Sequence, residues 1–277
     1  CTVDNCPLVL SYWGYRPNVP VNMAFAIMMG VVMIIVLVQG IWTRRFKKYT
    51  AMMFIGSVME ILGFVARIYA YSYPFSDLSF ITQLTTLTLA PAFYAAAIYF
   101  SLARIVVTFG AENSRIQPKF IPRIFITCDV VSLILQGGGG AYAAYLAQRE
   151  KMPDNGNYTM IGGLSFQALT LLVFLSLGAD FGIRTIKAYK NGGTMNENPE
   201  ARRLRSSKRF RAMLASLTLA AILIFMRSIY RVAELSEGWK GDLMSTESFV
   251  IWLESVPVAI SGFLLAIFHP ATCFPES

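Results

Sequence analysis

Three charged residues at the end of an apolar stretch are the first in this sequence that could do chemistry. Arg227, Arg231 and Glu234 stand at i, i+4 and i+7 after the apolar run 212–226, so a helix would place them on one face. In hydrocarbon each such charge costs roughly 2.5 to 3.5 kcal/mol on insertion scales. The stripe therefore indicates polar partners on neighbouring helices. The alternative is a helix end whose charges snorkel into the headgroup layer, which suits Arg227 least because it lies deepest.

The composition indicates that the whole chain belongs in a membrane. Of its 277 residues 55% are hydrophobic and 14% are charged, whereas a soluble domain carries roughly 25% charge. We therefore expect one all-α, polytopic transmembrane domain over residues 1–277. The net charge of +8 fits loops that face anionic lipid, so membrane lipids are expected partners and nucleic acid is not.

Seven apolar segments reach the roughly 20 residues that a helix needs to span a bilayer. They are Val21–Trp42, Ala51–Tyr71, Ile81–Val107, Ile121–Leu146, Ile161–Ile183, Ala212–Val232 and Phe249–Phe268. Basic residues gather in the 1–2, 3–4 and 5–6 connections, the last of which is the loop 187–211. The positive-inside rule then predicts an extracellular tail over residues 1–20 and a cytoplasmic C-terminus. This orientation places Asn157, an N-glycosylation acceptor in the 4–5 loop, outside.

Further polar residues lie inside the predicted spans. Glu60 falls near the middle of the second span and Arg67 two turns further out, while Glu247 and Glu254 share a face of the last span. With Gln136 and Gln167 of the fourth and fifth spans, these side chains should converge in the outer half. One interpretation is a polar cavity, open to the outside, that holds an amphipathic head group. The other is a set of buried ion pairs that fix helix register, such as Arg67 with a glutamate of the last span.

Other features of the spans have local interpretations. We expect Asp129 and Asp180 to pair with Arg123, Arg104 or Arg184 at the cytoplasmic rim. The glycine run 137–140 indicates either close helix approach or a pliable point. Pro91 and Pro257 should kink the third and seventh spans. Cys1 and Cys6 could pair in an oxidising compartment, or remain free.

The sequence offers no catalytic or metal-binding constellation. His269 is the sole histidine and no cysteine cluster exists, so a three-histidine zinc site cannot form. We expect neither an enzyme nor a cofactor. The Asp-Arg-Tyr and Asn-Pro-x-x-Tyr signatures of rhodopsin-like receptors are also missing from the sequence.

A series of short motifs runs through the chain in order. They are Gly14-Tyr15 with Pro17, Glu60-x-x-Gly63-x-x-x-Arg67, Ala90-Pro91-Ala92-Phe93, Asp129 with Gln136-Gly137-Gly138-Gly139, Gly162 with Gln167, and Arg227-Ser228-x-Tyr230-Arg231-x-x-Glu234. Together they resemble the fungal RTA1-like family, also called the lipid-translocating exporter family, over nearly the full length.

The resemblance implies a seven-span protein in the plasma membrane of a fungus. Such proteins have been connected with sphingoid long-chain base release, amino-sterol resistance and porphyrin traffic. The expected function is binding and translocation or export of amphipathic lipids or porphyrin-like compounds, which would confer resistance to toxic lipophilic molecules. The alternative is a seven-span sensor that signals membrane stress to a cytosolic partner at the 5–6 loop.

These considerations give a set of expected ligand-binding residues. They are Glu60, Arg67, Gln136, Gln167, Arg227, Tyr230, Arg231, Glu234 and Glu254. A lipid amine would need a carboxylate without a close arginine, for which Glu60 and Glu254 are the candidates. Such an acid should stay neutral in the empty site and ionise when a cation arrives. An anionic porphyrin should instead depend on Arg67 and Arg227.

Overall fold

The computed structural model of the chain is built of helices joined at their ends. It describes residues 13–110, 114–148, 154–190, 207–238 and 241–274, together with Pro7, Ser11, Glu112 and Leu204. The described ranges contain no strand. Cys1 and Cys6, whose pairing the sequence leaves open, and most of the basic loop 187–211 lie outside the described residues.

Seven helical stretches are long and apolar enough to cross a bilayer, which confirms the predicted all-α, seven-span architecture. The first six are single helices: α1 (Val19–Thr43), α2 (Lys47–Ser72), α3 (Asp77–Phe109), α4 (Ile121–Gln148), α5 (Asp154–Lys190) and α7 (Lys208–Ser236). A short helix α8 (Asp242–Ser245) precedes the last span. That span consists of α9 (Glu247–Phe249), a π-helical turn (Val250–Ser255), α10 (Val256–Ile267) and α11 (Pro270–Cys273).

Several helices extend beyond their apolar stretches. The largest difference is α5, which runs from Asp154 to Lys190 where the hydropathy predicted Ile161–Ile183. Polar residues at a membrane surface can continue the backbone hydrogen bonds of a helix without needing hydrocarbon around them. Asn157 therefore lies in the first turns of α5 and not in a loop, and its predicted glycosylation remains a prediction.

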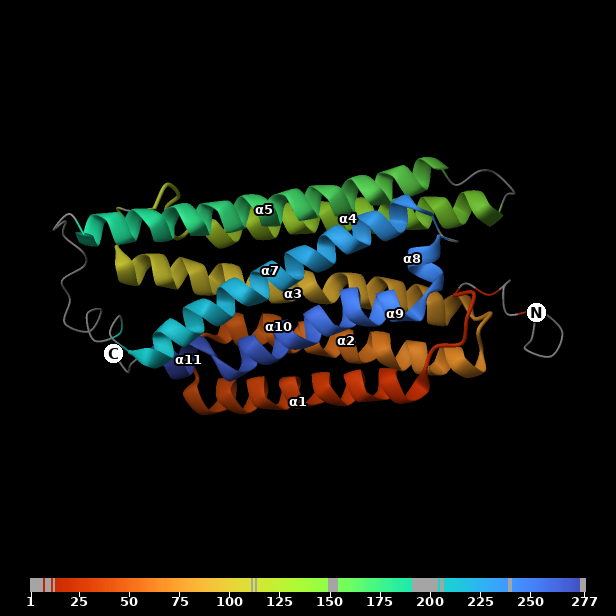
Figure 1. The fold of residues 1–277 in the computed structure, drawn as a ribbon, viewed down its shortest axis with the longest axis horizontal. Helices are drawn as coiled ribbons and strands as arrows, with labels where there is room; N and C mark the ends of the chain where they lie inside the picture. The colour runs from red at the N-terminus through yellow and green to blue at the C-terminus, as the bar shows by residue number, and fades with distance from the viewer. Residues whose placement is uncertain are drawn as a thin grey trace.

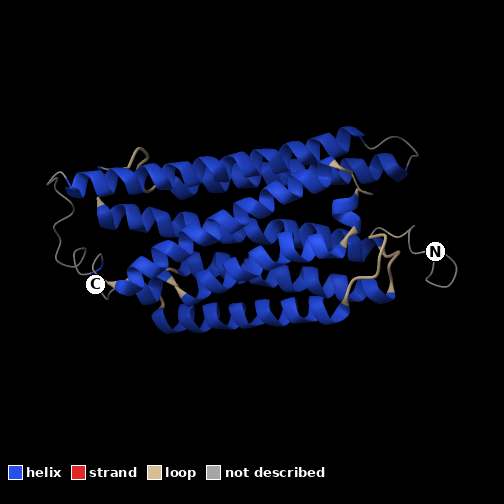
Figure 2. Cartoon of the chain, in the orientation of Figure 1, coloured by secondary structure: helices blue, strands red, loops and turns tan. Residues whose placement is uncertain are grey.

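The helices form an elongated bundle with loops only at its two ends (Figures 1 and 2). α4 and α5 form a pair along one side, α1 and α2 lie on the opposite side, and α3 lies between them, while α7 crosses the bundle obliquely (Figure 1). We call the end that carries residues 13–18 and α8 the tail end. The opposite end, which carries α11 and the connections after α1, α3 and α5, is the basic end.

The α4–α5 pair depends on close backbone contact at a glycine of each helix. A Cβ atom added to Gly139 would lie 2.6 Å from the Met160 backbone nitrogen, and one added to Gly156 would lie 2.5 Å from that of Ala143. Two helices approach this closely only where a side chain is missing. The close-approach interpretation of the glycine run is thus confirmed for Gly139, whereas Gly137 and Gly138 face open space.

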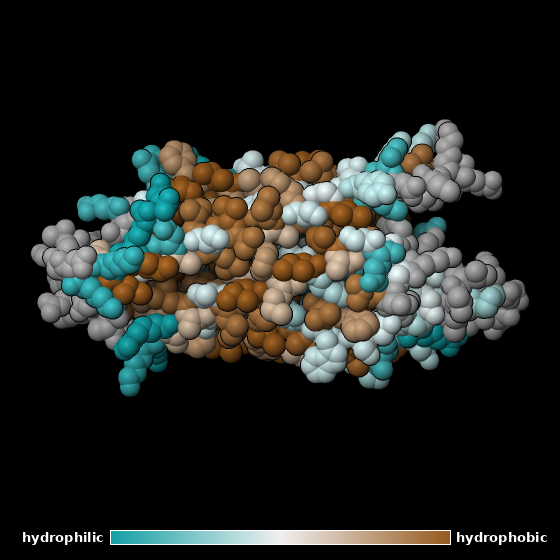
Figure 3. Space-filling model, turned by 45° about the horizontal axis from the view of Figure 1, so that its top comes forward, coloured by the Kyte–Doolittle hydropathy of each residue, from teal (hydrophilic) through white to brown (hydrophobic). Residues whose placement is uncertain are grey.

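The surface carries an apolar belt across the middle of the bundle (Figure 3). Large exposed side chains such as Ile27, Ile34, Ile134, Leu169 and Trp252 contribute to it. Hydrophilic residues gather at the basic end, on the left of Figure 3. A belt of this kind is covered by lipid in a membrane protein, because water would otherwise meet a large apolar surface.

Candidate ligand site

The charged stripe of α7 lies inside the bundle. Arg227 and Arg231 are each 4% exposed and Glu234 is 2% exposed. The prediction that they share one inward face is confirmed, and the alternative of a snorkelling helix end is wrong. Charges at this depth require partners, and the structure supplies them from the helices around α7.

Arg227 joins α7 to the last span and to α3. Its Nη2 donates to Glu254 Oε1 at 2.7 Å and to the backbone carbonyl of Leu87 at 2.6 Å. Arg231, one turn further along, donates from Nη1 to Glu234 Oε2 at 2.6 Å and from Nη2 to Thr88 Oγ1 at 3.4 Å. The same Nη1 lies 3.9 Å from Glu254 Oε1. Both arginines therefore act on one carboxylate of the last span.

Arg67 of α2 forms the other half of this network. Its Nε donates to Asn22 Oδ1 at 2.9 Å and its Nη2 to the Tyr15 hydroxyl at 3.0 Å. Glu247 Oε1 lies 3.6 Å from the same Nη2. The predicted pairing of Arg67 with a glutamate of the last span is confirmed. Burial raises the pKa of Tyr15 above its ordinary value, so this phenol remains neutral.

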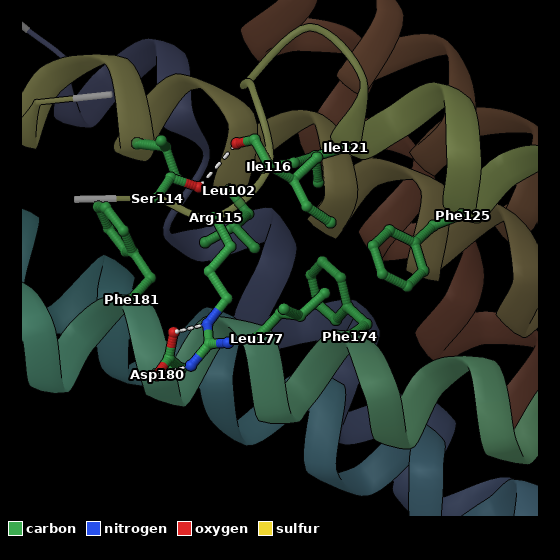
Figure 4. A pocket seen from close by; sticks show the side chains of 11 residues that line it. Leu102, Ser114, Arg115, Ile116, Ile121, Phe125, Phe174, Leu177, Asp180 and Phe181 are labelled. Carbon is green, nitrogen blue, oxygen red and sulfur yellow. Dashed lines mark hydrogen bonds and ion pairs between the residues drawn. The ribbon is translucent and has the colours of Figure 1, made fainter. Parts of the chain in front are cut away.

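Residues 13–18, the N-terminal segment, close the network at the tail end. Trp13 is buried, donates from Nε1 to Gln83 Oε1 at 2.9 Å, and packs edge-on against Phe80. The backbone N–H of Asn18 donates to Glu247 Oε1 at 2.7 Å. The expected open cavity is therefore replaced by a covered, packed network. The pocket in Figure 4 lies at the basic end instead.

A π-helical turn sets the position of Glu254. Within Val250–Ser255 the backbone bonds skip one residue more than in an α-helix, and the N–H of Val256 donates to the Ile251 carbonyl. The turn ends two residues before Pro257, which lacks an N–H and would crowd the carbonyl of residue 253 in a regular helix. π-helical turns recur at functional sites. Here the turn presents Glu254, 5% exposed, to Arg227.

Glu60 is the exception among the network's carboxylates. It is 2% exposed, has no ion pair in the described part of the chain, and its Oε1 has no hydrogen-bond partner. Arg227 and Glu254 lie near enough to interact electrostatically with the Glu60 carboxyl group. Glu254 was the other candidate for an unpaired acid, and that prediction is wrong because Arg227 bonds to it.

Gln136 and Gln167 stand apart from the ion pairs, whereas Tyr230 lies near Glu234, Glu254 and Arg231 without a hydrogen bond to them. Gln136 Nε2 donates to Gln167 Oε1 at 3.0 Å across the α4–α5 contact, and the Tyr230 hydroxyl donates to the Leu243 carbonyl at 3.0 Å. No hydrogen bond among the described residues connects either pair to the arginines. The structure thus gathers seven of the nine expected ligand-binding residues: Glu60, Arg67, Arg227, Tyr230, Arg231, Glu234 and Glu254.

The two aspartates of α4 and α5 behave differently from one another. Asp180 Oδ2 lies 2.9 Å from Nε of both Arg115 and Arg184, which confirms the predicted rim pairing. Asp129 makes no ion pair in the described ranges, so its predicted pairing is wrong. It is 4% exposed, deeper than the rim, where Arg123 remains exposed.

Several partners in the network were missed by sequence reasoning. Tyr15, Asn22, Thr88 and the Leu87 carbonyl all contact an arginine. Neutral side chains and backbone atoms carry no conspicuous signal in an apolar sequence. A signal did exist for Asn22, since it is an amide within the first predicted span and one turn after Asn18.

Fold and charges together define a seven-helix membrane protein with a buried ionic network near one end. The family model described as RTA1 like protein matches residues 53–277, so the chain belongs to the RTA1-like family.

Three relatives with curated names come from Saccharomyces cerevisiae. Sphingoid long-chain base transporter RSB1 is 28% identical over 286 aligned residues, which cover 95% of this chain and 74% of the relative. Protein RTM1 is 30% identical, with 78% of this chain and 65% of the relative covered. Protoporphyrin uptake protein 1 is 27% identical, with 75% and 64% covered. No solved structure matches the chain.

Proposed function

We propose that this protein binds amphipathic molecules that carry a cationic amine and moves them across the plasma membrane of a fungus. Resistance to toxic lipophilic compounds would follow from that movement. The names of two relatives, a sphingoid long-chain base transporter and a protoporphyrin uptake protein, support lipid-like substrates. Family membership and the seven spans are consistent with a carrier.

The observation that carries the proposal is the unpaired Glu60. The network holds four glutamates, at positions 60, 234, 247 and 254, and three arginines, at 67, 227 and 231. Fully ionised, it has one negative charge in excess. A bare carboxylate at this depth is costly, so the empty site favours the neutral acid. An ammonium group would stabilise the ionised form through a charge-assisted hydrogen bond.

The arginines serve this site indirectly. Each arginine lies close to at least one glutamate and donates hydrogen bonds to neutral groups of neighbouring helices. Together these contacts fix the positions of α2, α3, α7 and the last span around Glu60. The arginines leave Glu60 as the carboxylate of the described network without an ion pair, so Glu60 is the acid that can bind the ammonium group of a ligand. The N-terminal segment covers the tail end of the network, and a ligand that leaves toward that end has to displace it.

Replacement of Glu60 tests the proposal. Glu60→Gln keeps the shape of the side chain and removes its charge. Because hydrogen bonds to charged groups contribute roughly 1.5–3 kcal/mol, we expect about 10-fold or more weaker binding of sphingosine by the purified protein. The matched control is Glu112→Gln, since Glu112 is exposed. Equal sphingosine affinity in wild type and Glu60→Gln, with both proteins folded, would contradict the proposal.

Two further comparisons separate ligand class and mode of action. Glu60→Gln removes the excess negative charge of the network, which would repel an anionic porphyrin. The affinity for such a porphyrin should therefore not fall in this variant. Labelled sphingosine in vesicles that contain the purified protein should change leaflet faster than in empty vesicles. Binding without faster movement would favour the lipid sensor over the carrier.

A further inference from the structure

One turn of α2 from Glu60, toward the basic end, two hydroxyl groups are buried between α2 and α3. Ser57 precedes Glu60 by three residues, so both side chains lie on the same face of α2. Ser57 Oγ lies 3.1 Å from the Tyr94 hydroxyl of α3, and both residues are fully buried. This hydroxyl pair therefore borders the acid of the proposed site.

A glycine brings the Tyr94 ring against the backbone of α2. A Cβ atom added to Gly56 would lie 2.8 Å from Tyr94 Cε1, so a side chain at this position would displace the ring. The rise from Ser57 to Glu60 is about 4.5 Å along the helix axis. Glu60 also lies near enough to interact electrostatically with the Tyr94 hydroxyl. The phenol oxygen and the Glu60 carboxyl group are thus within reach of one small head group.

The hydrogen bonds of the pair leave the phenol oxygen without a donor. Ser57 donates its proton to the Met53 carbonyl at 2.9 Å, so Tyr94 is the donor in its contact with Ser57. The other neighbour of the hydroxyl, Met29 Sδ at 3.7 Å, can only accept. No group among the described residues donates to the Tyr94 oxygen. A buried acceptor that the protein leaves unused is available to a ligand.

A methyl-sized space adjoins this oxygen on the side of the last span. A Cβ atom added to Gly262 of α10 would lie 3.6 Å from the Tyr94 hydroxyl, 3.7 Å from Val32 Cγ1 and 3.8 Å from Met29 Cε. These are ordinary van der Waals separations, so one more heavy atom fits without displacing its neighbours. Of these three nearest atoms only the Tyr94 oxygen is polar. A ligand hydroxyl in this space would therefore donate to it.

We propose that the Tyr94 oxygen and the space beside Gly262 bind a hydroxyl group adjacent to the amine of the ligand, so that the site prefers long-chain amino alcohols to simple long-chain amines. This inference rests on the proposed function, because Glu60 must hold the amine. An amine and a hydroxyl on adjacent carbon atoms, with one hydrogen bond at each end, can span one turn of α2. An amine without the hydroxyl leaves the phenol oxygen unpaired, which disfavours it.

Binding of two probes by the purified full chain tests this inference. The first probe is dihydrosphingosine, which carries hydroxyl groups on both carbons next to its amine-bearing carbon. The second is octadecylamine, which has the same number of carbon atoms and no hydroxyl. Tyr94→Phe removes only the phenol oxygen, so we expect the affinity for dihydrosphingosine to fall about 3- to 10-fold, the effect of one neutral hydrogen bond, while that for octadecylamine is unchanged. The matched control is Tyr142→Phe, since Tyr142 is exposed on α4.

A second variant tests the same site without removing a hydrogen-bonding group. Gly262→Ala fills the space with a methyl group at van der Waals distance, and alanine favours a helix more than glycine does, so this variant should fold. We expect the same selective fall in affinity for dihydrosphingosine. The control is Gly30→Ala, because a Cβ atom added to Gly30 meets nothing within 4 Å.

The inference requires a selective loss of dihydrosphingosine binding in both folded variants, and any other pattern overturns it alone. An equal loss for both probes, for example, would mean that Tyr94 only packs α3 against α2. If Tyr94→Phe does not fold, Gly262→Ala decides. Glu60→Gln separates the two proposals, because it should weaken binding of both probes. Wild-type affinity for octadecylamine in folded Glu60→Gln overturns the proposed function, and this inference with it.

Discussion

Arg227 holds together the part of the buried network that lies between α7, α3 and the last span. Its Nη2 donates hydrogen bonds both to Glu254 and to the Leu87 carbonyl, so a single side chain connects three helices. Removing one partner of a buried pair costs roughly 3 to 5 kcal/mol, because the other charge stays buried without compensation. We therefore predict that Arg227→Ala lowers the unfolding temperature and the yield in detergent.

The comparison that decides this prediction is a double replacement. Arg227→Met with Glu254→Gln removes both charges and should recover most of the stability that Arg227→Ala loses. Arg123→Ala, at an exposed arginine, is the control and should resemble wild type. An Arg227→Ala protein as stable as wild type would mean that Arg231, 3.9 Å from Glu254, compensates alone.

Part of this network could be predicted from the residues themselves. The helical angle of 100° per residue placed Arg227, Arg231 and Glu234 on one face, and the cost of charge in hydrocarbon turned that face inward. The choice of partners could not be predicted. Whether Arg227 meets Glu254 or Glu60 depends on the rotation of the last span, which the π-helical turn changes.

At the scale of elements, the N-terminal segment contributes a cover that hydropathy does not reveal. Trp13 anchors it through Gln83 and Phe80, and Asn18 bonds to Glu247. We predict that Trp13→Ala loosens this cover, because both anchoring contacts are lost together. Hydrogen exchange followed by mass spectrometry should show faster deuterium uptake in residues 13–22.

The control for this prediction is Trp42→Ala, since Trp42 is 86% exposed at the other end of α1. It should leave exchange in residues 13–22 unchanged. Unchanged exchange in Trp13→Ala as well would show that Tyr15 and Asn18 hold the segment without Trp13.

The helices were predictable as elements but their details were not. Apolar length located all seven spans, because only a helix satisfies its backbone in lipid. The ends of α5 were misplaced since its polar turns have no hydropathy signal. The π-helical turn before Pro257 was expected only as a kink, because sequence does not say how a chain will accommodate a missing N–H.

At the scale of the whole molecule, charge is distributed unevenly between the two ends of the bundle. The described residues at the basic end include many lysines and arginines, whereas the N-terminal segment contributes Arg16. Those of the basic end are Arg44, Arg45, Lys47, Lys48, Arg104, Arg115, Lys119, Arg123, Arg184, Lys187, Lys190, Lys208, Arg209 and Arg211. The fold thus collects at one end the charges that the sequence places in alternate connections, because each span carries the chain to the opposite end of the bundle.

This asymmetry predicts the orientation of the protein in a cell. Basic residues are retained on the cytoplasmic side, where anionic lipids also attract them. The basic end should therefore face the cytoplasm, with the N-terminal segment and the covered network facing outward. Trypsin added to intact cells should spare residues 187–211, although this stretch is rich in lysine and arginine, and should cut there once the cells are permeabilised. Cleavage within 187–211 in intact cells would reverse the orientation, and with it the direction in which the proposed site receives its ligand.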